Sequence, residues 1–195
     1  MAIPWWPVGR YSNSDHTACC LPIRHLVEAD IAHNLDRQKI GLVAVVQSLL
    51  WARTVQAALL HRLAHAAWRR GLTPISEILL RISQLLFSVD IHYTARVGPG
   101  LVLRHCMNVV VGKHAQIGRN AMIFQGVTIG VRFGPGDGMP TVGDNVVLGA
   151  GSCLLGPIHV GDEAVIGANT VVTRDVPTRC LCTGSPARIS DQLPW

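Results

Sequence analysis

Charged residues are scarce in this chain of 195 residues: they make up 15% of the sequence, whereas hydrophobic residues make up 49%. The formal net charge of +5 is mild, which fits a soluble enzyme that handles an anionic cofactor. We predict no nucleic-acid partner, because no basic stripe with interleaved aromatic residues is present. A composition this apolar predicts that the chain forms oligomers and that part of its apolar surface is buried between subunits.

The sequence also lacks long hydrophobic runs and a secretory signal. The first seven residues contain no basic region followed by an apolar core. The stretch from Ile40 to Ala52 is apolar, but it is too short to span a bilayer, and Gln47 interrupts it. We therefore expect no membrane span and a cytoplasmic location.

The six cysteines do not predict a disulfide framework, because a chain this long and apolar needs no covalent cross-links. Cys153 falls where a small buried residue fits, which favours a reducing compartment. Cys180 and Cys182 form a pair that could suggest a metal, but one pair without a second is a weak signal. We predict no metal.

An apolar residue recurs every six positions from Ile91 onward. A glycine often follows it directly, as in Val97-Gly98, and a small residue recurs four positions later. Neither an α-helix, with a period of 3.6, nor a flat strand, with a period of two, has this spacing. The apolar positions are Ile91, Val97, Leu103, Val111, Ile117, Ile123, Ile129, Val142, Leu148, Leu154, Val160, Ile166 and Val172.

Short strands joined by tight turns around a triangular coil explain this period, with one hexad on each side of the coil. We predict an α+β fold: an N-terminal α-helical segment followed by a left-handed parallel β-helix of hexapeptide repeats, from about Ile91 to about Val176. The predicted domains are an N-terminal arm and helical domain over residues 1–88, the β-helix domain over residues 89–189, and a short tail over residues 190–195.

Three helices are expected ahead of the repeats, over residues 21–35, over residues 39–70, and from Thr73-Pro74 onward. Arg69-Arg70-Gly71 is a plausible end for the second helix, with cations near its carboxyl end and a glycine after them. The second helix is expected to present an apolar face of Val43, Val46, Leu49, Leu50, Val55, Leu59, Leu63 and Ala66, and the third a face of Ile75, Ile78, Leu79, Ile82, Leu85 and Leu86.

The repeat is interrupted twice. The interval from Leu103 to Val111 is eight residues, so two residues are inserted just after His105. The interval from Ile129 to Val142 is thirteen, so a glycine-rich loop over residues 131–139 leaves the coil. Insertions in repeat proteins collect where the function is.

The chain from about Glu28 to Arg188 resembles the serine acetyltransferase family of hexapeptide-repeat acyltransferases. The Asp-Ile-His element fifteen residues ahead of a coil histidine is its most specific part. The matching motifs are Val89-Asp90-Ile91-His92, Leu103-Arg104-His105, Gln125-Gly126-Val127-Thr128-Ile129-Gly130, Gly149-Ala150-Gly151, Ile166-Gly167-Ala168 and Gly184-Ser185-Pro186-Ala187-Arg188. The resemblance implies an acetyl-CoA-dependent O-acetyltransferase that works as a homotrimer or a dimer of trimers, with active sites between subunits.

The resemblance makes His105 the general base and Asp90 the group that orients it. An alcohol loses its proton as it attacks a thioester, and an imidazole that titrates near neutrality can accept that proton. A carboxylate on the other ring nitrogen fixes the tautomer. The alternatives are that His105 is a structural turn histidine, that Cys106 forms an acyl-enzyme, or that His92, His105 and His114 bind a metal.

The acetyl-CoA site is expected along the coil. Gly130, Ala150 and Ala168 are small residues on successive coils, and they would leave a groove for the pantetheine arm. Ala150 and Ala168 are eighteen residues, or one coil, apart and should stack. Arg188 is the candidate for a phosphate contact. Simple repeat packing is the alternative for each.

The acceptor side departs from the family pattern, which has an acidic residue where Arg104 stands and an Arg-His pair where Gly138-Met139 stands. An arginine would repel an ammonium and attract an anion, and Asp36 is a candidate replacement contact. We therefore predict an acceptor other than free L-serine: a sugar, a modified amino acid or a specialised metabolite. Genuine L-serine O-acetylation of cysteine biosynthesis, N-acetylation and a non-catalytic scaffold are the alternatives.

Overall fold

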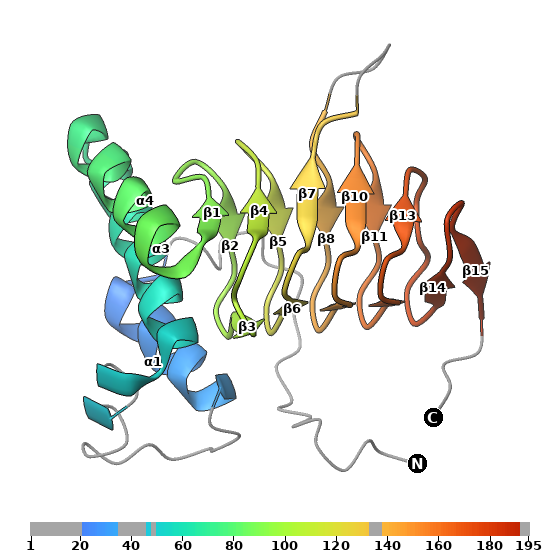
Figure 1. Ribbon diagram of the computed structural model, residues 1–195, viewed down its shortest axis with the longest axis horizontal. Coiled ribbons are helices and arrows are strands. Elements are labelled where there is room, and N and C mark those ends of the chain that lie inside the picture. Colours follow the sequence, from blue (N-terminus) through green and yellow to red (C-terminus); the bar gives the residue numbers. More distant parts are fainter. Residues whose placement is uncertain (1–20, 35–45, 48–49, 133–137, 192–195) are drawn as a thin grey trace.

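The computed structural model describes residues 21–34, 46–47, 50–132 and 138–191. Helices α1 (Ile23–Asn34), α3 (Arg53–Arg69) and α4 (Thr73–Phe87) gather at one end of a stack of β-strand coils (Figure 1). This arrangement confirms the predicted fold class, a helical segment followed by a parallel β-helix of hexapeptide repeats. Within the described residues, no helix is both long and apolar enough to cross a membrane.

The first four coils each contribute one strand to each of three sheets, and the last coil reaches the second sheet only through an isolated bridge from Val176 to Val160. The first sheet contains β1 (Val89–Ile91), β4 (Val109–Val111), β7 (Thr128–Gly130), β10 (Cys153–Leu155) and β13 (Val171–Val172). The second contains β2 (Arg96–Val97), β5 (Gln116–Ile117), β8 (Thr141–Val142) and β11 (His159–Val160). The third contains β3 (Val102–Arg104), β6 (Met122–Phe124), β9 (Val147–Leu148), β12 (Val165–Ile166), β14 (Leu181–Thr183) and β15 (Arg188–Ser190).

Strand pairing is parallel except between β14 and β15, which close the last coil as an antiparallel pair. The hexad positions pair in register from coil to coil, as Ile117 does with Val142 and Val142 with Val160. The strand β15 ends at Ser190, one residue inside the predicted tail.

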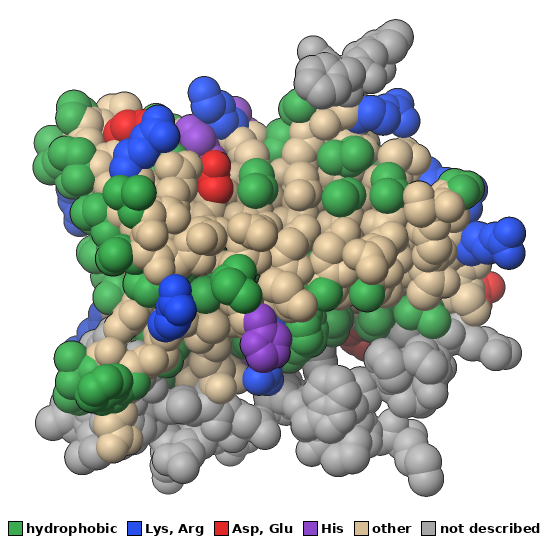
Figure 2. Space-filling view, in the orientation of Figure 1, with side chains coloured by type: hydrophobic (Ala, Val, Ile, Leu, Met, Phe, Trp, Pro, Cys, Tyr) green, Lys and Arg blue, Asp and Glu red, His purple; other side chains and the backbone are tan. Residues whose placement is uncertain are grey.

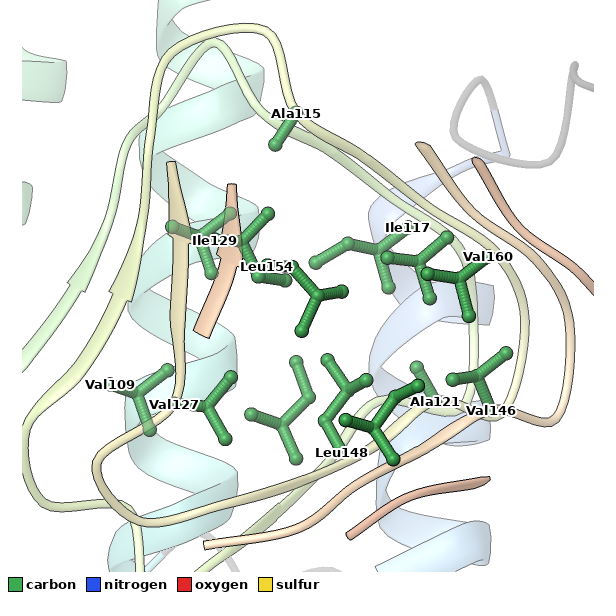
Figure 3. Close-up of a cluster of buried hydrophobic side chains, with 14 of the residues drawn as sticks. Val109, Ala115, Ile117, Ala121, Val127, Ile129, Val146, Leu148, Leu154 and Val160 are labelled. Atoms are coloured by element: carbon green, nitrogen blue, oxygen red, sulfur yellow. The ribbon is translucent and has the colours of Figure 1, made fainter. Parts of the chain in front are cut away.

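The predicted apolar positions form the core of the coil. Every one of the thirteen is buried, with at most 4% of its surface exposed. The small residues four positions later are fully buried as well, and Figure 3 shows Ala115 and Ala121 pointing inward with Ile117, Ile129 and Leu148. The six-residue spacing therefore identifies the side chains that fill the triangular interior.

The glycines after the apolar positions have a steric reason. A Cβ added to Gly98 would lie 2.6 Å from the carbonyl oxygen of Gly118 on the next coil, and one added to Gly149 would lie 2.7 Å from the amide nitrogen of Ala168. Real Cβ atoms essentially never come so close to backbone atoms. Glycine therefore lets successive coils stack at the corners.

The second predicted helix is shorter than expected. Residues 35–45 and 48–49 lie outside the described residues, and Val46, Gln47, Leu50 and Trp51 are helical. Ala52, however, is extended (φ −87°, ψ 95°), and α3 begins after it. The prediction of one continuous helix over residues 39–70 is therefore wrong at Ala52. The predicted end at Arg69-Arg70-Gly71 is confirmed.

The predicted apolar face of α4 points away from the core. Ile78 and Leu85 are 59% and 83% exposed, whereas Ser76 and Ser83 are buried. The Ser76 hydroxyl donates to the Ala64 carbonyl of α3 at 2.9 Å, so this small polar side chain allows the two helices to pack closely. Hydrophobic side chains consequently gather on the surface of the helical end, which Figure 2 shows in green.

The predicted face of α3 is also partly wrong. Val55 is buried as expected, but Val46, Leu50 and Leu63 are 46%, 63% and 39% exposed. The helix instead buries alanines together with His61 and Arg62. A buried arginine is stable in such a place only with a partner, and the structure supplies one in Asp30 of α1.

Candidate active site

One edge of the triangular coil carries most of the predicted site residues. It is the edge where the sheet of β3 meets the sheet of β1, and the chain crosses it four times before β14 turns back into β15. We call it the His105 edge, defined by His105, Gln125, Ala150, Ala168 and Arg188. Each of these residues lies in a turn after a strand of the third sheet or, for Arg188, at the start of β15.

Backbone hydrogen bonds between turns hold this edge together. The Gly126 amide donates to the Met107 carbonyl at 2.9 Å, the Gly151 amide to the Gln125 carbonyl at 2.9 Å, and the Asn169 amide to the Ala150 carbonyl at 2.8 Å. Successive coils are spaced by about 4.8 Å, as neighbouring strands are. The His105 turn and Ala168 are three coils apart, so about 14 Å separates them along the edge.

His105 begins the two-residue insertion between β3 and β4. Its backbone is in the left-handed region at φ 53°, and its carbonyl accepts a hydrogen bond from the Met107 amide. Asn120, Asn145 and Asn169 in the turns of later coils have the same left-handed backbone, so this conformation is a recurrent feature of the coil turns. The turn leaves the His105 side chain exposed.

Asp90 lies near the same edge, on the outward face of β1 in register with Val110 of β4. His105 stands five residues before Val110, in the turn that leads into β4, so the proximity of Asp90 and His105 stays a prediction. No hydrogen bond joins them among the described residues, so the orienting contact stays a prediction. The Asp90 carboxylate acts on His92 instead, where it partly offsets the effect of burial, which lowers the pKa of His92.

The candidate acetyl-CoA residues divide into two groups. Ala150 and Ala168 stack in register on the His105 edge, as predicted, and Arg188 lies near the same edge, opposite Thr183 at the end of the coil. Gly130 does not join them. It ends β7 and pairs with Leu155, so it lies at the opposite end of that strand, on the next edge of the coil. Within one chain, Gly130 therefore does not share a groove with Ala150 and Ala168, contrary to the prediction.

The candidate acceptor residues are also on separate edges. Arg104 ends β3, is exposed, and lies beside His105. Met139 lies in the loop between β7 and β8, with its Sδ and Cε atoms over Gly112, where a Cβ on Gly112 would be 2.6 Å from Cε. The two residues therefore do not meet within one chain. Asp36 lies outside the described residues.

Two of the alternatives from the sequence can be compared with the structure. Cys106 is buried at 5% exposure, and burial raises the pKa of its thiol, which disfavours the thiolate that an acyl-enzyme requires. In the part of the chain that the structure describes, no group of three His, Cys, Asp or Glu side chains could hold a metal ion.

Comparison with known proteins places this geometry in a family. The family model described as "Hexapeptide repeat of succinyl-transferase" matches residues 141–174. The chain is 41% identical over 136 residues to a serine acetyltransferase of Helicobacter pylori, which covers 69% of this chain and 79% of that protein. The chain belongs to the serine acetyltransferase family.

Other serine acetyltransferases are similar to this chain in sequence and in structure. The Synechococcus elongatus enzyme is 43% identical over 135 residues, covering 69% of this chain and 55% of that protein. Soybean serine acetyltransferase complexed with serine has a TM-score of 0.78 at 38% identity, covering 86% of this chain and 69% of that one. The chain thus spans little more than half the length of some curated members of the family that it matches.

The structure adds a residue whose role the sequence did not reveal. Gln125 lies on the His105 edge, one coil beyond His105, and its Oε1 atom is buried with no hydrogen-bond partner among the described residues. A buried amide oxygen without a partner is costly unless a ligand supplies the donor. The only sign of such a role in the sequence was the position of Gln125, a polar residue directly after an apolar strand of the coil. Because the chain belongs to the serine acetyltransferase family, Gln125 is a candidate contact for the acyl donor or the acceptor.

Proposed function

We propose that this chain is an acetyl-CoA-dependent O-acetyltransferase whose acceptor is L-serine. The observation that carries the proposal is the placement of His105, Asp90, Ala150 and Ala168 along one edge of a serine acetyltransferase fold. The solved relatives include one in complex with serine and one in complex with coenzyme A, the latter from Brucella abortus at 35% identity and a TM-score of 0.77. These relatives favour L-serine over the different acceptor predicted from the sequence.

In the proposed mechanism His105 accepts the proton of the acceptor hydroxyl while the oxygen attacks the thioester carbonyl. Asp90 stabilises the imidazolium that forms, and backbone amides of the edge stabilise the oxyanion. The tetrahedral intermediate then expels the coenzyme A thiolate, which takes the proton from His105. The products are the acetyl ester and free coenzyme A, and the base returns to its starting state.

We propose a homotrimer or a dimer of trimers as the active assembly. The loop that carries Met139 and the turn that carries His105 lie on different edges, so a neighbouring chain would have to bring the two together. Exposed apolar residues border the proposed contact: Met107, Val110 and Val131 are 56%, 41% and 50% exposed. The apolar face of α4 could join two trimers. A native mass measurement separates the two assemblies.

The four described cysteines are free thiols, which fits the proposal of a cytoplasmic enzyme in a reducing compartment.

Substitution of His105 tests the mechanism. His105→Ala should lower the rate of thiol release from acetyl-CoA by about 10² to 10⁴, the usual contribution of a positioned base. Asp90→Asn should cost less if Asp90 only orients His105. His159→Ala, on an exposed part of β11, is the matched control and should keep full activity. Full activity in His105→Ala would assign the base to another residue, and no thiol release from the unaltered chain would support the scaffold alternative.

The charge of Arg104 favours a second class of acceptor, one without an ammonium group near the reacting hydroxyl. Arg104 forms no ion pair with a described residue, and it stands beside the proposed base. Two unit charges about 4 Å apart interact by roughly 4 kcal/mol at an effective dielectric near 20, so an arginine there would disfavour the ammonium of serine. On this alternative the acceptor is a hydroxylated sugar, an acid or a modified amino acid without a nearby cation.

Steady-state kinetics with a panel of acceptors distinguish L-serine from the alternative acceptor class. The panel contains L-serine, hydroxylated sugars, hydroxy acids and a primary amine for the N-acetylation alternative. A kcat/KM for L-serine at least as high as for any other acceptor supports the main proposal. A poor kcat/KM for L-serine that improves in the Arg104→Asp, Met139→His double variant supports the second.

A further inference from the structure

A cavity of about 350 Å³ lies between the start of α1, the C-terminal half of α3 and the second strand of the first coil. Its walls include Ile23, His61, His65, Arg69 and Val97. None of the residues of the proposed acyl-transfer site lines it. Its volume falls in the range of small-molecule sites, so it is large enough for a compact organic ligand.

The lining of the cavity is cationic and contains no carboxylate. Arg62 is neutralised by Asp30, but Arg69 and Arg70 are exposed and form no ion pair with a described residue. The cavity also borders the N-terminus of α1, the positive end of the helix dipole, and no acidic residue stands in its first turn. Among the described residues that line the cavity, no carboxylate pairs with Arg69 or Arg70.

Two histidines line the same cavity: His61 is buried and His65 is half-buried. His61 is 4% exposed, and its Nδ1 atom is buried with no hydrogen-bond partner in the part of the chain that the structure describes. His65 donates from Nδ1 to the Tyr93 carbonyl at 2.8 Å. Burial first, and then Arg69, Arg62 and Arg96, lower the pKa of His65, and no acidic group acts on it. An anion bound beside Arg69 and Arg62 would offset the positive charge that acts on His65.

We propose that this cavity binds a small organic anion, with its acidic head held by Arg69 and Arg70 and its apolar body against Leu26, Ala66 and Val97. A charge-assisted hydrogen bond from a guanidinium is the strongest polar contact that the cavity offers. The apolar walls contribute by the burial of a short hydrocarbon chain. This site is separate from the acyl-transfer site, and the proposal does not depend on the acceptor or on catalysis.

Calorimetric titration of the full chain tests the proposal with three probes: hexanoate, inorganic phosphate and 1-hexanol. Hexanoate should bind saturably, and phosphate and 1-hexanol should bind more weakly, because each lacks one half of the recognised chemistry. The Arg69→Gln, Arg70→Gln double variant should weaken hexanoate binding by at least about tenfold. Arg81→Gln, an exposed arginine on α4 away from the cavity, is the matched control and should bind as the unaltered chain does.

A second variant fills the cavity without changing its charge. Ala66→Leu should also weaken hexanoate binding, while circular dichroism shows that the helices remain folded. The NMR signals of the His65 ring should move on addition of hexanoate. The proposal is overturned by no saturable binding of hexanoate up to about 10 mM, by equal binding of 1-hexanol or phosphate, or by a double variant that binds as tightly as the Arg81→Gln control.

Discussion

Removal of the Asp30 carboxylate should destabilise the fold strongly. Asp30 and Arg62 are 2% and 3% exposed, and they form a two-point ion pair with N–O distances of 3.1 and 3.0 Å. Asp30 also accepts the Leu101 amide at 2.8 Å, while Arg62 donates to the carbonyls of Val97 and, at 2.6 Å, of Gly98. The pair thus links α1 and α3 to the first coil.

In Asp30→Ala the Arg62 cation stays buried without its partner. Breaking a buried pair from one side costs about 3–5 kcal/mol, and an unpaired buried amide such as that of Leu101 adds about 1–3 kcal/mol. These costs are not additive, because the groups share one network. We expect a loss of about 3–5 kcal/mol, a large part of the 5–15 kcal/mol that stabilises a typical domain.

Urea unfolding followed by circular dichroism measures this loss at a fixed protein concentration. Glu77→Ala removes one partner of the exposed Arg81–Glu77 pair, and it should cost no more than about 1 kcal/mol. An equal, small loss in Asp30→Ala and Glu77→Ala would refute the reasoning, because it would mean that water reaches the Asp30–Arg62 pair. A double variant that replaces Asp30 and Arg62 with leucine and methionine should regain part of the loss.

Two further predictions follow from buried polar groups. Burial lowers the pKa of His61 well below 6.5, so the folded chain keeps His61 neutral, whereas the unfolded chain takes up a proton near that pH. Stability should therefore be full above pH 6.5 and fall below it by up to about 1.4 kcal/mol per pH unit, and urea midpoints at several pH values should show a shallower decline in His61→Gln. Gln125→Leu should raise the KM for acetyl-CoA or acceptor about 3- to 10-fold without loss of stability. Ser152→Ala, which removes a buried unpaired hydroxyl inside the coil, should leave the kinetics unchanged; equal kinetic effects in both variants would exclude a ligand contact for Gln125.

The amino-acid sequence determined the β-helix almost completely. The spacing of the apolar positions identified the buried side chains of every coil, from Ile91 to Val172, and Gly149 marks a corner where stacking coils leave no room for a Cβ. These features follow from the sequence because each hexad makes the same local turn and packs on the hexad one coil later. The contacts repeat with the period of the chain, so periodicity alone shows which residues are inside.

The same local logic predicts part of the candidate site. Asp90 and His105 are fifteen residues apart, somewhat less than one coil, so the spacing favours positions near one corner. Ala150 and Ala168 stack for the same reason. Gly130 could not be placed as readily, because the sequence shows that a residue recurs but not which edge of the triangle it reaches.

Only the tertiary structure decided which faces of the helices are buried. The apolar stripe of α4 predicts a buried face, yet α4 buries Ser76, Leu80, Ser83 and Phe87 and exposes Ile78 and Leu85. An apolar stripe on a helix has the same periodicity whether it packs against the core of its own chain or against another subunit. Periodicity alone therefore cannot distinguish these two kinds of burial.

Arg62 and Asp30 are a second example of what only the structure shows. Both residue types are usually exposed, and their separation of 32 positions carries no periodic signal. The packing of α1 against α3 makes them partners, and the first coil supplies the remaining hydrogen bonds. The repeat thus determined the fold locally, residue by residue, whereas non-periodic contacts between helices and coil decided which charges are buried, which apolar face stays exposed and where a cavity remains.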